Sequence, residues 1–414
     1  DPQDPRTALY AYLNGRTAAC DVDNVALVYP FGCNASQKLA VQRALGNRVS
    51  VVEGPPGTGK TQTILNIVAN LLMQGKTVGV VSNNNAAVDN VRDKLSKYEY
   101  GALMAELGNR TRRQAFFADK QQDFMPDPTW RLPAEERTAL RTRLGELSAA
   151  IDELFRVNAE LADLRTKRSY AQCEYRHLLW EQPLDEARMR RVDRCFFRPI
   201  DSRRALSFRH LVTERWQGGR PSLALRAGLL FRCGAWPGKR LFADAELLPP
   251  YADRKFYETY IAELSARIAR LGAPSDEQRA KSLIEAYGKV SEALFRDMLY
   301  RKYERLNEAR QEERPPFTMQ NYRTHFRTFV ERYPVVLSTT HSLCASIGAG
   351  HLLDYVIIDE SSQVDILTAA VCCACCRNII IIGDSRQLPH IVEEQLRAKA
   401  EELRVLYVAM TRAK

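Results

Sequence analysis

Gly54-Pro55-Pro56-Gly57-Thr58-Gly59-Lys60-Thr61 is a glycine-rich turn between a predicted strand, residues 48–53, and a predicted helix, residues 60–74. Glycines in such a turn let successive backbone N–H groups point inward around phosphate groups, at the positive end of the helix that follows. The ammonium group of Lys60 suits the β- and γ-phosphates of a nucleoside triphosphate, and the hydroxyl of Thr61 suits Mg²⁺. The sequence therefore predicts a P-loop that binds ATP and Mg²⁺.

Strand and helix patterns alternate on both sides of this turn. Further apolar, strand-like runs occupy residues 76–82, 335–339, 355–359 and 378–383. Residues 86–97 have the apolar spacing of an amphipathic helix. Runs that are apolar throughout are typical of parallel strands that are buried on both faces. We therefore expect one parallel α/β domain, built from residues 34–100 and 334–392.

Asp359 and Glu360 end one of these apolar runs. A carboxylate at the carboxyl end of a parallel strand points into the same crevice as a P-loop in that sheet. An Asp-Glu pair after a strand is often only a solvated strand end, but the P-loop favours a catalytic interpretation. We expect Asp359 to bind Mg²⁺ and Glu360 to polarise the attacking water.

Several segments, in this order, resemble the motifs of superfamily 1B helicases of the nonsense-mediated-decay and senataxin type. They are Asn34-Ala35-Ser36-Gln37, the P-loop, Ser82-Asn83-Asn84-Asn85-Ala86-Ala87-Val88-Asp89, Asp359-Glu360-Ser361-Ser362-Gln363 and Gly383-Asp384-Ser385-Arg386-Gln387-Leu388-Pro389. The resemblance implies a RecA-like P-loop NTPase domain in which Asn34 and Gln37 contact the adenine and Gln387 senses the γ-phosphate. It also implies a nucleic-acid track that includes Asn85, Thr339, Thr340 and His341, although ordinary loop polarity would explain these four residues too.

The end of the chain, residues 406–414, is similar to the sixth motif of the same family. Arg412 would then be the arginine finger of a second RecA-like domain, a role that suits a permanently charged, planar group. Only about a dozen residues separate this motif from the third one, whereas such a domain needs ~100 residues. We expect residues 393–414 to be a remnant of that domain, after a break in the chain between Ile391 and Leu406. The first residue, Asp1, also suggests a fragment.

Residues 101–333 separate the two halves of the predicted sheet and have the composition of a mainly helical insertion. Two series of apolar residues repeat every three or four positions: Leu140, Leu144, Leu147, Ile151, Leu154, Leu161 and Leu164, and then Tyr257, Ile261, Leu264, Ile268 and Leu271. Two antiparallel helices that form a stalk, with residues 168–250 as an accessory module at its end, fit this pattern. Two amphipathic helices packed on the sheet fit it equally well. Residues 1–33 are expected to be a separate N-terminal segment.

Positive charge is concentrated in one part of this insertion. The chain has a net charge of +10, and residues 187–240 contain 14 basic residues but only three acidic ones. Aromatic residues are interspersed among the arginines, and cations neutralise phosphates while aromatic rings stack on bases. Candidate contacts to a single strand are Arg188, Arg191, Arg194, Arg203 and Arg204. A basic surface over a small aromatic core is the alternative explanation.

The ten cysteines do not indicate a disulfide framework, because most are scattered along the chain. Residues 372–376, Cys-Cys-Ala-Cys-Cys, contain two overlapping C-x-x-C spacings of the kind that bind zinc or an iron–sulfur cluster. One short helix end cannot direct four thiols at one ion, so we expect buried structural cysteines. No apolar run of eighteen residues and no secretory leader is evident, so we expect a cytoplasmic protein, in a bacterium, without a membrane partner.

These observations predict an ATP- and Mg²⁺-dependent superfamily 1 helicase or translocase that acts on single-stranded DNA or RNA. The family resemblance implies movement from 5′ to 3′. An alternative is an ATP-gated nucleic-acid clamp or defence-complex subunit that does not unwind. A P-loop kinase fits residues 54–61 but not Gln387 or the basic segment. A nuclease or other protein partner is compatible with the sequence, which determines neither the oligomeric state nor the choice between DNA and RNA.

Overall fold

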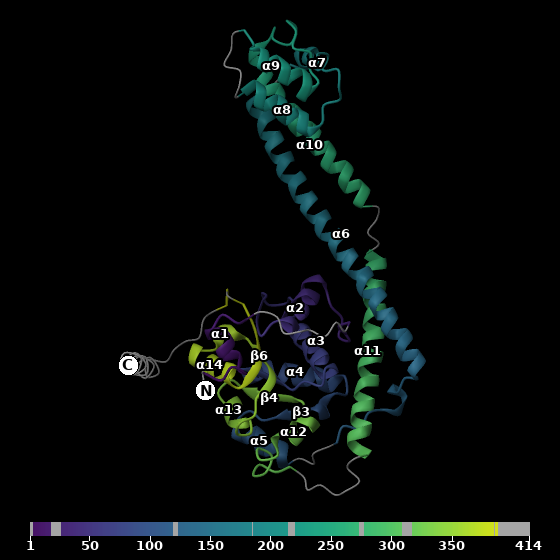
Figure 1. The fold of residues 1–414 in the computed structure, drawn as a ribbon, viewed down its shortest axis with the longest axis vertical. Coiled ribbons are helices and arrows are strands. Elements are labelled where there is room, and N and C mark those ends of the chain that lie inside the picture. Colours follow the sequence, from purple (N-terminus) through teal and green to yellow (C-terminus); the bar gives the residue numbers. More distant parts are fainter. Residues whose placement is uncertain are drawn as a thin grey trace, which may run out of the picture. The chain divides into compact units, whose positions relative to one another are not determined.

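The computed structural model of the chain describes residues 3–17, 26–118, 123–183, 185–213, 220–272, 277–308, 317–384 and 386–387. It divides into two compact units, one from residues 1–150 and 281–414 and the other from residues 151–280. The long helix α6 (Ala134–Glu181) begins in the first unit and ends in the second (Figure 1). The first unit contains the P-loop and the whole β-sheet, so it positions the candidate site.

A six-stranded sheet forms the centre of the first unit (Figure 1). Its strands are β1 (Val49–Glu53), β2 (Val78–Ser82), β3 (Met104–Glu106), β4 (Val335–Thr339), β5 (Leu353–Asp359) and β6 (Cys376–Gly383). The spatial order is β1-β6-β5-β2-β4-β3, and every neighbouring pair is parallel. The predicted parallel α/β architecture is therefore confirmed. Because all strands are parallel, their carboxyl ends meet at one edge, where the P-loop begins.

The sheet is buried on both faces, which explains why its strands are nearly continuous apolar runs. On one face, Val81 and Val336 belong to a buried cluster with the aromatic ring of Phe329. On the other face, Val68 and Leu72 of helix α3 (Lys60–Met73) lie beside Val335 of β4. The helix that leaves the P-loop is thus held against the centre of the sheet.

Short and medium helices surround the sheet. Those that lie wholly or partly in the first unit, besides α3 and α6, are α1 (Ala8–Leu13), α2 (Ala35–Gly46), α4 (Asn85–Lys97), α5 (Arg110–Ala118), α11 (Glu277–Glu308), α12 (Phe326–Arg332), α13 (Leu343–Ser346) and α14 (Ile366–Ala374). Single 3₁₀ turns occupy Gly101–Leu103, Pro128–Trp130 and Ser361–Gln363. Among the residues that the structure describes, no helix combines the length and the apolar character that crossing a bilayer requires.

The sheet extends further along the chain than the sequence predicted. Strand β3 lies within residues 101–333, which we expected to be insertion, yet it pairs in parallel with β4. The aromatic rings of Phe116 in α5 and Phe329 in α12 lie 6.3 Å apart and pack over the same face of the sheet. These elements therefore belong to the core of the first unit. A three-residue strand without a β-branched residue carries no periodic signal, and its position depends on a partner strand far away in the sequence.

The second unit is helical and has an apolar core of its own. Its elements, besides α6, are α7 (Glu186–Asp193), α8 (Ser202–Thr213), α9 (Leu223–Gly228), a π-helical turn (Leu229–Cys233), a 3₁₀ turn (Ala245–Leu247) and α10 (Leu248–Leu271). Phe208 and Tyr251 are buried in this core. Helices α6 and α10 pair antiparallel: the Tyr175 hydroxyl donates to Glu258 at 2.9 Å, and Arg267 forms an ion pair with Glu160.

Candidate active site

The P-loop connects β1 to α3 and is tied to the end of a second strand. Gly59 has a φ of 81°, in the left-handed region, and a Cβ atom at this position would collide with the side-chain amide of Gln37. Only glycine fits both conditions. The N–H of Gly54 donates to the carbonyl of Gly383 at 3.0 Å, which joins the loop to the end of β6. The conformation at Gly59 and the bond to Gly383 thus fix the course of the loop between β1 and α3.

Lys60 and Glu360, some three hundred positions apart in the sequence, meet in this crevice. The Lys60 ammonium lies 3.6 Å from a carboxylate oxygen of Glu360. It is buried, and no group in the described part of the chain accepts a hydrogen bond from it. Buried donors are rarely left without an acceptor, and phosphate oxygens are strong acceptors for an ammonium group. This position is compatible with the role that the P-loop pattern predicts for Lys60 at the β- and γ-phosphates, which stays a prediction.

Glu360 is held in an unusual backbone conformation. Its φ is 51°, in the left-handed region that non-glycine residues rarely adopt. The N–H of Glu360 donates to a carboxylate oxygen of Asp359 at 2.9 Å, which helps to hold this turn. Uncommon backbone conformations are often found at functional sites, where the surrounding structure maintains them. The turn allows the two adjacent carboxylates to point in different directions.

Asp359 fits the role of a metal ligand. It ends β5, lies in register with Ser82 of β2 and is buried. Burial raises the pKa of the Asp359 carboxyl, the N–H of Glu360 lowers it, and the charge of Glu360 raises it further. The protein alone thus stabilises the ionised form poorly, and a divalent cation beside it would supply the missing positive charge. The oxygen of Asp359 and the hydroxyl of Thr61 are hard donors of the type that Mg²⁺ prefers.

The raised pKa makes a prediction for stability. Because the folded state holds the Asp359 proton more tightly than the unfolded chain does, folding is favoured at acid pH and this contribution is lost as the pH rises through the folded pKa. Asp359→Asn removes the buried charge, so we expect a higher Tm than wild type at neutral pH in the presence of EDTA. The shift should be ~2–4 °C for each kcal/mol of penalty removed, and it should shrink on acidification. Calorimetry at several pH values measures it, and a variant that is less stable than wild type at pH 7 contradicts this assignment.

Side chains around the P-loop hold it in place. Gln37 donates from its amide to the carbonyl of Thr58 at 3.1 Å, and its amide oxygen accepts the N–H of Asn34 at 3.0 Å. The Asn34 side chain in turn accepts the N–H of Gln37 at 2.9 Å, so the two residues form a capping box at the start of α2. Both residues lie beside the loop, as expected, but their polar atoms already serve the protein. Their contact with adenine stays a prediction.

Asn90 is a residue of this site that the sequence did not reveal. Its side-chain amide donates to the Thr61 hydroxyl at 3.3 Å. Asn90 lies one turn into α4 and is exposed, and a lone asparagine on the polar face of an amphipathic helix carries no signal in the sequence. This bond occupies one lone pair of the Thr61 oxygen and orients the hydroxyl, and the other lone pair is available to a metal.

Gln387 lies beside the segment that follows Glu360. The Ser362 hydroxyl donates to the side-chain oxygen of Gln387 at 3.4 Å. At the end of β6, a Cβ atom on Gly383 would collide with the hydroxyl of Ser361, so glycine is required for this close approach. The two segments that resemble the Walker B and third helicase motifs are therefore in contact. Ser385, Leu388 and Pro389 of the third motif lie outside the described residues, as do Arg412 and the whole of residues 393–414.

The four residues predicted to lie along the nucleic-acid track have different environments. Thr339 ends β4 in register with Ser82, and His341 is exposed and lies 3.4 Å from the hydroxyl of Thr368. Asn85 is the first residue of α4 and is half-buried. Thr340 corrects the prediction, because its side chain is buried and does not reach a surface that a strand could contact. The motif resemblance gave no sign that the Thr340 side chain is buried.

The arginines of the second unit also divide into two groups. Arg188 forms an ion pair with Asp244 at 2.8 Å, and Arg204 donates to the carbonyl of Pro199 at 2.6 Å. By contrast, Arg191, Arg194 and Arg203 are exposed and have no ion-pair partner among the residues described. Large aromatic side chains of this unit are exposed as well, namely Phe197, Phe231 and Trp236. Phe208 is buried in the core, and Trp216 lies outside the described residues.

The cysteine cluster spans the end of α14 and the start of β6, and its buried members belong to the same apolar cluster as Val336 and Phe329. Cys372, Cys375 and Cys376 are buried, and Cys373 is half-buried. The thiol of Cys372 donates to the carbonyl of Thr340 at 3.5 Å. Within the described ranges, no group of three or more potential ligands is arranged to hold a metal ion. Burial raises the pKa of the Cys372 thiol to about 12, as expected for cysteines that pack in a core.

Comparison with known proteins identifies the family. A family model described as an AAA domain matches residues 32–395, which is most of the chain. The chain belongs to this family. The superfamily 1B helicase resemblance of its motifs is also confirmed.

Named relatives match shorter stretches. The chain is 39% identical over 93 residues to the DNA polymerase alpha-associated DNA helicase A of Schizosaccharomyces pombe, which is 22% of this chain and 14% of that protein. It is 32% identical over 129 residues to a regulator of nonsense transcripts 1 homolog from Neurospora crassa, or 30% of this chain and 11% of that protein. It is 29% identical over 143 residues to the DNA-binding protein SMUBP-2 of Mesocricetus auratus, or 34% of this chain and 13% of that protein. The matched stretches are thus a small part of each relative.

Proposed function

We propose that this chain carries the first motor domain of an ATP-dependent superfamily 1 helicase or translocase that acts on a single nucleic-acid strand. The observation that supports it best is the 3.6 Å approach of Lys60 to Glu360 across the sheet. A phosphate-binding ammonium and a carboxylate that can polarise water lie next to each other there. Family membership and the helicases among the relatives agree with this proposal.

Each residue of the crevice has one part in hydrolysis. The backbone N–H groups of the P-loop and the Lys60 ammonium would hold the β- and γ-phosphates, which neutralises the charge that develops on transfer. Mg²⁺, held by Thr61 and Asp359, would add positive charge beside the phosphates. Glu360 would orient the attacking water and accept its proton, and Gln387, through Ser362, would respond to the γ-phosphate.

Nucleic-acid contact is proposed on two surfaces. In the first unit, Thr339, His341 and Asn85 would lie along the strand. In the second unit, the exposed arginines Arg191, Arg194 and Arg203 would contact phosphates, and the exposed rings of Phe197, Phe231 and Trp236 would stack on bases. Phosphate contacts and base stacking are both possible with DNA and with RNA. The same proposal includes movement from 5′ to 3′ and action in the bacterial cytoplasm. It also includes an arginine finger at Arg412 and adenine contact by Asn34 and Gln37.

The rate of ATP hydrolysis with and without single strands tests the function. A motor should hydrolyse ATP faster when poly-deoxy or poly-ribo strands are present, and the full-length protein should displace a paired strand. Stimulation without displacement would favour an ATP-gated clamp. A phosphorylated small-molecule product in place of free phosphate would favour a kinase and contradict the proposal.

The basic surface gives a separate prediction. Replacing Arg191, Arg194 and Arg203 by alanine should weaken binding to a single-stranded oligonucleotide by about tenfold or more and reduce the slope of log K against log salt by about 2, since each phosphate contact contributes about 0.7. Fluorescence anisotropy at several salt concentrations measures both quantities. The matched control replaces three exposed arginines of α6, Arg156, Arg165 and Arg176, which removes the same charge elsewhere in the unit. Equal losses in both variants would mean that only net charge matters.

A further inference from the structure

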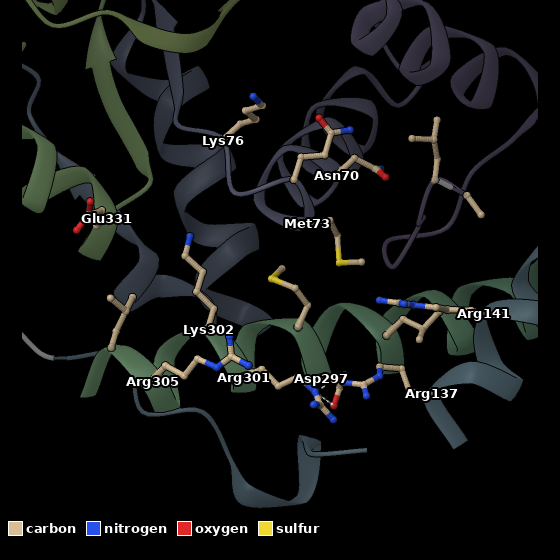
Figure 2. A pocket seen from close by; sticks show the side chains of 16 residues that line it. Asn70, Met73, Lys76, Arg137, Arg141, Asp297, Arg301, Lys302, Arg305 and Glu331 are labelled. Carbon is tan, nitrogen blue, oxygen red and sulfur yellow. Dashed lines mark hydrogen bonds and ion pairs between the residues drawn. The ribbon is translucent and has the colours of Figure 1, made fainter. Parts of the chain in front are cut away.

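A second basic site lies at the opposite end of helix α3 from the P-loop. A cavity of about 890 Å³ is lined by Asn70 and Met73, at the end of α3, and by Lys76, which precedes β2. Since α3 has 14 residues and Lys60 begins it, the two ends are separated by ~20 Å at 1.5 Å per residue. Helices α6 and α11 supply most of the other lining residues (Figure 2), and Ala26, Leu27 and Glu331 of α12 complete the lining. The cavity is therefore distinct from the site of ATP hydrolysis.

The charges that line this cavity are strongly unbalanced. Among the described residues that line it, two carboxylates, Asp297 and Glu331, face six cations: Lys76, Arg137, Arg141, Arg301, Lys302 and Arg305. Figure 2 shows Arg141 and Lys302 projecting from different helices toward the space beside Met73. Lys76, Arg141 and Arg305 are exposed, whereas Arg137, Arg301 and Lys302 are half-buried. The positive potential therefore lies where an anion from solution can reach it.

The buried carboxylate of Asp297 does not offset this excess, because the fold already uses it. It accepts from the Arg301 guanidinium at 2.9 Å and from the N–H of Leu132 at 2.8 Å, and Arg137 lies 3.7 Å from it. Lys76, Arg141, Lys302 and Arg305 have no ion-pair partner in the described part of the chain. Burial lowers the pKa of Lys302, and only the charge of Glu331 opposes this effect. Four cations are thus available to a ligand.

One wall of the same cavity is apolar. Met73 of α3 and Met298 and Leu294 of α11 line it, together with Leu27. Thioether and aliphatic side chains adapt to the flat face of a ring and exclude water from it. The volume lies within the ~300–1,000 Å³ of typical small-molecule sites. A cationic side and an apolar side in one space of this size match a molecule that has phosphate groups and a ring-shaped body.

We propose that this cavity binds a small phosphorylated ligand of nucleotide size. Its phosphate groups would contact Arg141, Lys302 and Arg305, and its body would lie against Met73 and Met298. Phosphate is favoured over a single carboxylate because Arg141 of α6 and Lys302 and Arg305 of α11 line the same cavity, and a ligand with phosphate groups offers acceptors to more than one of them.

Equilibrium binding of ADP tests the proposal, because the P-loop and the cavity should appear as two separate sites. We expect wild type to bind two ADP per chain, with inorganic tripolyphosphate competing at both. Lys60→Ala should weaken only the P-loop site. The double variant Arg141→Ala/Arg305→Ala should lose at least about tenfold in affinity at the other site and leave ATP hydrolysis unchanged. A failure of the P-loop assignment is thus distinguishable from a failure of this one.

Arg143→Ala is the matched control. Arg143 lies on the same helix as Arg141, is exposed, and pairs with Glu146 at 2.9 Å outside the cavity. It should leave both sites unchanged. Because removing unpaired cations relieves repulsion, the double variant should have a Tm no lower than that of wild type. ADP should raise the Tm of Lys60→Ala, and this increase should disappear when Arg141→Ala and Arg305→Ala are added to Lys60→Ala. A wild type whose single ADP site is lost in Lys60→Ala and kept in the double variant overturns the proposal. So does a second site that the double variant retains, or one that only an oligodeoxynucleotide occupies.

Discussion

Lys60→Ala should abolish ATP turnover, with kcat lowered by about a hundredfold to a thousandfold or more, while the chain stays folded. The Lys60 ammonium is buried, donates no hydrogen bond to the described residues and lies 3.6 Å from a carboxylate oxygen of Glu360. The fold therefore gains little from this group, whereas a triphosphate would gain a charged donor at the position where negative charge develops. Glu360 is partly exposed, so water can solvate its carboxylate when the ion pair is lost.

Phosphate release measures this effect, and circular dichroism and the Tm report the fold. The control is Lys97→Ala, which removes the same charge from the exposed last turn of α4. We expect the control to keep wild-type turnover. Near-normal hydrolysis by the Lys60 variant would contradict the assignment of the whole crevice, since the roles of Asp359 and Glu360 depend on a triphosphate bound at the P-loop.

The sequence predicted the parallel sheet and the proximity of Lys60 to Glu360, because both depend on local patterns. A glycine turn between an apolar strand and a helix has one common geometry, and parallel strands direct their carboxyl ends to the same edge. Strand β3 could not be predicted in this way. Met104–Glu106 has no alternation and is too short for a period, and it is a strand only because it pairs with β4.

Contacts between side chains that are distant in the sequence could not be predicted either. Nothing in the pattern distinguishes Arg188, which pairs with Asp244, from Arg191, which is exposed and unpaired among the residues described. The motif resemblance likewise grouped Thr340 with Thr339, although only the structure shows that the Thr340 side chain is buried. Gln37 is a further case: its type suits an adenine edge, but here its amide holds the carbonyl of Thr58. Tertiary packing decides which of these side chains are paired, buried or exposed.

Glu360→Gln should lower kcat by about 10²–10⁴-fold and, unlike Lys60→Ala, preserve or strengthen ATP binding. The amide has the same shape as the carboxylate but cannot accept the proton of the attacking water. The left-handed turn at Glu360 is held through its backbone N–H, which donates to Asp359, so the substitution should not disturb it. Removing a negative charge 3.6 Å from the Lys60 ammonium also leaves that ammonium free for the γ-phosphate.

The two variants therefore differ in binding although both are inactive, and this difference separates catalysis from positioning. With a fluorescent ATP analogue, Glu360→Gln should bind at least as tightly as wild type, and in a motor it should remain bound to single strands as long as ATP is present. Glu360→Asp is the matched variant: it keeps a carboxylate on a shorter side chain and should recover part of the turnover. If Glu360→Gln hydrolyses ATP at the wild-type rate, another group activates the water. If it binds ATP as weakly as Lys60→Ala does, Glu360 has a structural role in the crevice, and a different residue accepts the proton of the attacking water.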